Sequence, residues 1–223
     1  MASRVQVRDD VAGLLVSRGN FLVGADASIP VSRVEALLSH EVGTHVLTYV
    51  NAQAQPFKQL YCGLPNYEEL QEGLAVLAEY LSGGLSRPRL RLLAGRVIAA
   101  NHLIDGASFI DVFRDLNRTH RFEQRTAFMI AMRVFRSGGL TKDAVYLKGL
   151  LRLLDYFEKG GELEPLLLGK FSLEHLPIVK ELQWRKVLVP PLILPRYLNH
   201  KEALARFEML RKGLSVLHLV GER

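Results

Sequence analysis

Hydrophobic and polar residues alternate along the first part of the chain with the period of a β-strand. This alternation marks three short segments, residues 4–8, 11–17 and 20–24. Residues 18–20, Arg-Gly-Asn, form a turn signal between the last two segments. We therefore predict a small antiparallel sheet near the N-terminus.

After residue 28 the hydrophobic spacing becomes that of a helix. The first helix is expected to open around Pro30 and to end near Asn51, and a loop over residues 52–66 leads to a second helix over residues 67–82. Further helical segments are expected over residues 89–104, 108–117, 122–135, 141–159, 162–168, 173–184 and 201–212, with a turn at residues 137–139. A last apolar run, residues 214–220, is expected to be a strand. The pattern predicts one mostly helical α+β domain over residues 1–223.

Residues 40–45, His-Glu-Val-Gly-Thr-His, and Glu72 on the next helix are candidate metal ligands. Imidazole nitrogen and carboxylate oxygen both suit Zn²⁺, and three protein ligands leave a fourth position open for water. Glu41 follows His40 directly and points about 100° away from it on a helix. That direction suits a residue that contacts the metal-bound water and not the metal, so the pattern indicates a single-zinc hydrolase. The alternative is that both histidines are ordinary helix residues and that Glu72 is a surface acid.

The two histidines are five residues apart, which turns an ideal helix by about 140° from one to the other. That geometry would not bind one ion. Either the helix carries a π-bulge, which adds a residue to one turn, or it ends near Gly43 and His45 reaches the ion from a distorted turn. We predict a distorted helix here. Gly73, in the middle of the next helix, indicates that another backbone or the ion packs closely against it.

Composition and charge limit the kinds of partner and the cellular location that can be expected. Hydrophobic residues make up 48% and charged residues 23%, which fits a globular fold with a substantial core. Cys62 is the only cysteine, so no intrachain disulfide is possible and a reducing, cytoplasmic location is expected. No apolar run is long enough to span a bilayer, so no membrane partner is expected. The net charge of +6 is dispersed and no nucleic-acid module is evident, which argues against nucleic acid as a partner.

Three segments together resemble one family: residues 40–45, residues 71–75 (Gln-Glu-Gly-Leu-Ala), and residues 139–147 (Gly-Leu-Thr-Lys-Asp-Ala-Val-Tyr-Leu). This is the QEGLA-motif metallopeptidase family, which includes the eukaryotic microtubule-associated tyrosine carboxypeptidase and bacterial members labelled as flavohemoglobin expression modulators. The resemblance implies that His40, His45 and Glu72 bind zinc and that Glu41 is the catalytic acid and base. It also implies that the enzyme hydrolyses a peptide bond near the C-terminus of its substrate. By the same resemblance, this chain is expected to be the C-terminal, catalytic part of a longer protein.

Two further roles are needed for such a reaction. Tyr146 and Lys142, four residues apart on one helix face, are candidates to stabilise the oxyanion, although Tyr146 is equally well explained as a core aromatic residue. Arg133 and Arg136 are candidates to bind the terminal carboxylate of the substrate, because a guanidinium binds both oxygens at once.

A second interpretation is a non-catalytic zinc-containing module that regulates a partner by binding it. The basic surface and the regulatory label of the bacterial members favour it. Glu41 argues against it, because a purely structural zinc site does not need a carboxylate beside a ligand.

Overall fold

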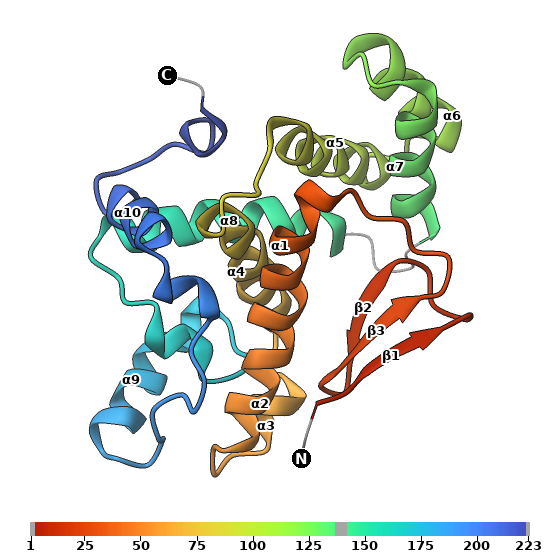
Figure 1. Cartoon of the computed structure of the whole chain (residues 1–223). Helices are drawn as coiled ribbons and strands as arrows, with labels where there is room; N and C mark the ends of the chain where they lie inside the picture. The colour runs from red at the N-terminus through yellow and green to blue at the C-terminus, as the bar shows by residue number, and fades with distance from the viewer. Residues whose placement is uncertain (1–2, 137–141, 222–223) are drawn as a thin grey trace. The chain divides into compact units, whose positions relative to one another are not determined.

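A computed structural model describes residues 3–136 and 142–221. Its contacts divide the chain into two compact units, residues 1–85 with 149–223, and residues 86–148. The predicted class, a mostly helical α+β fold with a small N-terminal sheet, is confirmed (Figure 1). The assignment of residues 1–223 to one catalytic domain stays a prediction.

The sheet has three strands: β1 (Val5–Arg8), β2 (Leu14–Ser17) and β3 (Asn20–Gly24), in the order β1-β3-β2. β2 and β3 form the predicted antiparallel hairpin, with positive φ angles at Arg18 and Gly19 in the turn. β1 instead pairs with β3 in parallel, so the sheet is mixed and not purely antiparallel. Strand β3 is the central strand, and its residues Phe21 and Leu22 are buried.

A nearly continuous helical rod follows the sheet (Figure 1). It consists of α1 (Val31–His40), the π-helix η1 (Glu41–Val46) and α2 (Leu47–Gln53). The short helix α3 (Gln59–Cys62) lies within the predicted loop, and α4 (Tyr67–Leu81) then packs against α1 and η1. Strands β2 and β3 contact η1, so the π-helix lies between the sheet and α4 in the contact pattern of this unit.

Helices α4 and α8 (Lys142–Glu158) approach so closely at Gly73 that only glycine fits at this position. A Cβ atom on Gly73 would lie 2.5 Å from the carbonyl carbon of Gly149, in α8, and one on Gly149 would lie 1.9 Å from the Glu69 carbonyl oxygen. Neither position has room for a side chain. The prediction that a backbone packs closely against Gly73 is confirmed, and this contact holds the helix that carries Glu72 in place.

The C-terminal part of the first unit consists of short helices and turns. They are η3 (Glu164–Leu167), η4 (Leu173–His175), α9 (Leu176–Trp184), η5 (Arg196–Asn199), α10 (Lys201–Leu210) and η6 (His218–Val220). The strand predicted over residues 214–220 is wrong. The side chain of His218 accepts a hydrogen bond from the backbone N–H of Ser215 at 3.1 Å, and such a local bond favours a turn over an extended strand.

The second unit is a small helical group. It comprises α5 (Arg87–Ile104), α6 (Phe109–Arg114), the π-helix η2 (Asp115–Thr119), α7 (Gln124–Arg136) and the start of α8. Its core includes Leu116, Ile130 and Val134. Ser108 caps α6 as predicted, in a reciprocal arrangement with Asp111. The predicted turn at residues 137–139 lies outside the described residues.

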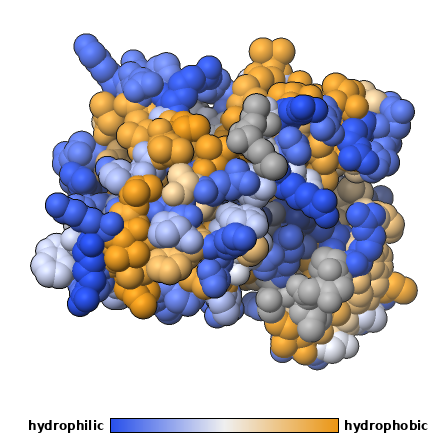
Figure 2. All heavy atoms as spheres, turned by 90° about the horizontal axis from the view of Figure 1, so that it is seen from below, coloured by the Kyte–Doolittle hydropathy of each residue, from blue (hydrophilic) through white to orange (hydrophobic). Residues whose placement is uncertain are grey.

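None of the helices in the described residues is long and apolar enough to cross a bilayer. Hydrophobic groups and hydrophilic groups are interspersed over the face shown in Figure 2.

Candidate metal centre

The π-helix brings the two histidines to one side of the rod. Within it the backbone N–H of Leu47 bonds the carbonyl of Val42, five residues earlier. The hydroxyl of Thr44 also donates to the carbonyl of Ser39, five residues back, at 3.1 Å. Bonding of this kind puts residues five apart on the same face, as an α-helix does for residues four apart. The rings of His40 and His45 consequently lie 5.2 Å apart, and the predicted distortion is confirmed as a π-helix.

Glu72 completes a three-atom cluster with these rings. Its Oε2 lies 3.7 Å from His40 Nε2 and 3.5 Å from His45 Nε2, and ligand atoms of the three residues lie within 4.8 Å of one another. Ligand atoms about 2.0–2.1 Å from a tetrahedral zinc are separated by roughly 3.3 Å, so the two Glu72 distances are close to those of a bound ion. Two imidazoles and one carboxylate are also a donor set that zinc accepts. The three residues could therefore hold a metal ion.

Glu79 supports the site from behind His40, and the sequence interpretation missed it. Its carboxylate is fully buried, and its Oε1 lies 3.0 Å from His40 Nδ1. Arg33 donates to the other oxygen at 2.6 Å. When Nδ1–H donates to Glu79, the Nε2 atom of His40 is left free for a metal. The available signal was an acid two helical turns after Glu72, directly after the apolar run of residues 73–78.

Replacing Glu79 by glutamine should weaken zinc binding by about 10- to 100-fold, because outer carboxylates orient the ligand ring and raise its basicity. Competition with a chelator of known affinity measures the effect. Glu174→Gln is a control, since Glu174 pairs with Arg152 and not with a candidate ligand. Equal zinc affinity in Glu79→Gln and the unmodified protein would contradict the supporting role.

The charge of Glu41 acts on His45, one of the three clustered residues. Burial lowers the pKa of His45, but the hydrogen bond and charge of Glu72 and the charge of Glu41 outweigh it, so the pKa of the imidazole is raised in the metal-free protein. Glu41 thus acts on the site although it is not one of the three clustered ligands. The role of Glu41 as a carboxylate that contacts water and not the ion stays a prediction.

Two side chains near the cluster were not anticipated. Burial and then the charges of Glu68 and Glu72 raise the pKa of Tyr67, which begins α4. The second side chain is Lys170, whose positive charge lowers the pKa of His45. Lys170 is far from the ligands in sequence, and no motif marked it.

The accessory residues proposed from the sequence belong to the other unit. Arg133 pairs with the buried carboxylate of Asp143, and the guanidinium of Arg96 lies 5.6 Å from the centre of the Tyr146 ring. Arg136 and Lys142 line a cavity of about 550 Å³ within this unit. The catalytic role of Tyr146 and Lys142, and carboxylate binding by Arg133 and Arg136, stay predictions.

His102 and His120 share one carboxylate in the second unit. The Nε2 atom of His102 lies 3.0 Å from Asp115, and that of His120 lies 3.3 Å from the same carboxylate.

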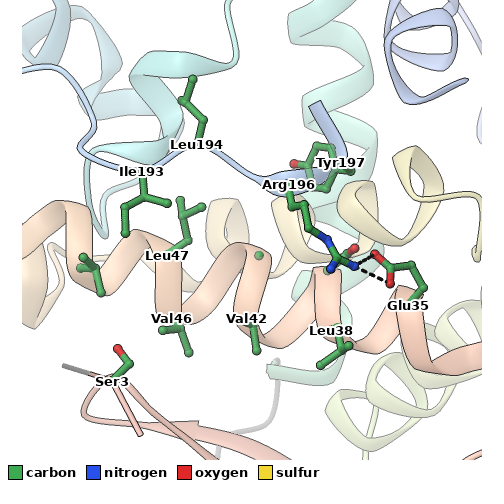
Figure 3. Close-up of a pocket in the computed structure, with 13 residues that line it drawn as sticks. Ser3, Glu35, Leu38, Val42, Val46, Leu47, Ile193, Leu194, Arg196 and Tyr197 are labelled. Atoms are coloured by element: carbon green, nitrogen blue, oxygen red, sulfur yellow. Dashed lines mark hydrogen bonds and ion pairs between the residues drawn. The ribbon is translucent and has the colours of Figure 1, made fainter. Parts of the chain in front are cut away.

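A groove of about 580 Å³ runs along the rod (Figure 3). Val42 and Val46 line it, together with Ile193 and Leu194, and an ion pair of Arg196 with Glu35 lies at one end. The candidate ligands do not line this groove, so it adds no donor to the metal centre.

The profile of the family described as "Microtubule-associated tyrosine carboxypeptidase" matches residues 1–215. The chain belongs to this family. The resemblance inferred from the sequence motifs is therefore confirmed.

Relatives with related names cover much of the chain. The mouse protein named "Putative tyrosine carboxypeptidase MATCAP2" is 29% identical over 189 residues, which are 77% of this chain and 35% of that protein. Mouse "Microtubule-associated tyrosine carboxypeptidase 1" is 33% identical over 135 residues, 54% of this chain and 27% of that protein. The chain thus spans about a quarter to a third of the length of these family members.

Proposed function

We propose that this chain is the catalytic part of a zinc-dependent carboxypeptidase that hydrolyses a peptide bond near a protein C-terminus. The observation that carries the proposal is the approach of His40, His45 and Glu72 to within 4.8 Å of one another, with Glu41 beside them. The names of the relatives support a C-terminal residue, tyrosine in their case, as the part removed.

Each residue of the site has a separate role in the proposed reaction. His40, His45 and Glu72 would hold zinc, which supplies Lewis acidity to polarise the scissile carbonyl and acidify water. Glu41 accepts a proton from the attacking water and later delivers one to the departing amine. Glu79 keeps the His40 ring oriented through its Nδ1 atom. Proton transfer in this reaction requires a carboxylate near the reacting atoms that does not bind the ion. In our proposal this carboxylate is Glu41.

The remaining parts of the proposal rest on the sequence. Tyr146 and Lys142 are retained as oxyanion-stabilising candidates. A peptide or protein C-terminus is the proposed substrate, and the single cysteine of the chain supports a reducing, cytoplasmic location.

The proposal predicts metal-dependent release of one C-terminal residue. The zinc-loaded protein, incubated with a peptide that ends in tyrosine, should release free tyrosine, detected by mass spectrometry. A chelator should abolish release and added zinc should restore it. No release by fully zinc-loaded protein from a library of peptide C-termini would contradict the proposal. Binding of a partner without cleavage and without dependence on zinc would instead support the non-catalytic module.

A further inference from the structure

Lys170 is held at a defined place beside the metal centre by its backbone. Its N–H donates to the carbonyl of Leu60 at 2.7 Å, and its carbonyl accepts from the N–H of Leu64 at 2.9 Å. Both partners belong to the segment that joins α2 to α4, between the helices that carry the ligands. The preceding residue, Gly169, lies so close to Leu60 that a Cβ atom would be 2.8 Å from the Leu60 Cβ. The side chain of Lys170 therefore starts from a constrained point.

Two aromatic rings from the ligand-bearing helices flank its ammonium group. Lys170 Nζ lies 5.8 Å from the centre of the Tyr49 ring and 5.5 Å from that of Tyr67. Tyr49 comes four residues after His45 in the rod, and Tyr67 starts the helix that carries Glu72. The charge of Lys170 also acts on His45, so the cation lies in the neighbourhood of the metal centre.

The ammonium group is incompletely neutralised there. Lys170 is half-buried, and no carboxylate of the described residues forms a salt bridge with it. Burial lowers its pKa, opposed by the charge of Cys62. Aromatic faces stabilise a cation only modestly compared with an anionic partner. A carboxylate from a bound molecule would supply the missing charge.

A terminal carboxylate also needs such a cation here. Glu41, Glu72 and Glu79 surround the histidines with negative charge. Arg33 pairs with Glu79. A bound zinc ion would be offset by the charges of Glu41 and Glu72, so the centre itself leaves little positive charge for a terminal carboxylate. Lys170 would supply that charge. An amidated or internal peptide carries no terminal carboxylate and gains nothing from Lys170.

We propose that Lys170 binds the α-carboxylate of the substrate's C-terminal residue, with Tyr49 and Tyr67 at its sides. This inference rests on the proposed function and names the residue that restricts cleavage to chain ends. It assigns to the first unit the role that the sequence suggested for Arg133 and Arg136.

The kinetic test compares one peptide in two forms, with a free C-terminal carboxylate and with a C-terminal amide. Lys170→Met should raise KM for the free acid by about 10- to 100-fold, the range of one charge-assisted hydrogen bond, with kcat changed little. Cleavage of the amide should change little, zinc content should be unaltered, and Lys170→Arg should restore part of the loss. Lys180→Met is the matched control, because Lys180 forms an exposed ion pair with Glu162.

A binding test keeps this inference separate from the proposed function. Calorimetric titration of the zinc-loaded Glu41→Gln protein should show the free acid binding about 10- to 100-fold more tightly than the amide, and Lys170→Met should remove that difference. Equal affinity for acid and amide, or an equal loss of both in Lys170→Met, would overturn the role of Lys170. Failure of the unmodified protein to cleave either peptide would contradict the proposed function, whereas the titration would still decide on Lys170.

Discussion

Glu41→Gln should lower kcat by about 10²- to 10⁴-fold while zinc stays bound, the range of a single general base. Glutamine has nearly the same shape as glutamate, but it cannot accept a proton from water. Glu41 directly follows the ligand His40, and its charge acts on His45, yet it is not in the cluster of three ligands. Steady-state kinetics and elemental analysis on the same preparation measure both parts of this expectation.

Glu35→Gln is the matched control for this change. Glu35 is an exposed glutamate on α1, and its carboxylate pairs with Arg196 at 2.7 Å. Its replacement should leave kcat within about threefold, since exposed ion pairs contribute little. Cleavage at the normal rate in Glu41→Gln would reject Glu41 as the base. Loss of zinc from that variant would instead make Glu41 a ligand.

His45→Ala should lower zinc affinity by more than about 100-fold and remove activity with it, because one of three protein ligands is lost. The α1–η1–α2 rod should persist, since alanine is a good helix former. Zinc content after dialysis, measured by mass spectrometry, gives the result, and circular dichroism checks that the fold remains.

His200→Ala provides the comparison for this second change. His200 is exposed next to α10 and is not among the clustered ligands, so its replacement should leave zinc content unaltered. A His45→Ala protein that retains one zinc per chain at full affinity would show that a different set of residues binds the ion.

The ligand set was accessible from local sequence because each member lies in a short, distinctive segment. His40 and His45 frame a glycine-containing stretch, and Glu72 lies in the next amphipathic helix. The awkward five-residue spacing was itself informative, because only a distorted helix can make both rings converge. The structure has that distortion as η1.

Residues that act through tertiary contacts could not be found in the same way. Glu79 contacts His40 only because α4 packs against α1, and Lys170 comes beside Tyr49 and Tyr67 only through its backbone pairing with the segment after α2. The parallel pairing of β1 with β3 is likewise a long-range choice that alternation alone does not specify.

The sequence by itself determined the helical rod, the hairpin, the three clustered candidate ligands and the need for a distorted turn, because these depend on periodicity and spacing within one or two neighbouring elements. Only the tertiary structure decided which carboxylate supports His40, which cation stands beside the ligands, and which backbone excludes a side chain at Gly73. Those contacts join residues far apart along the chain, and their partners are set by how the helices pack.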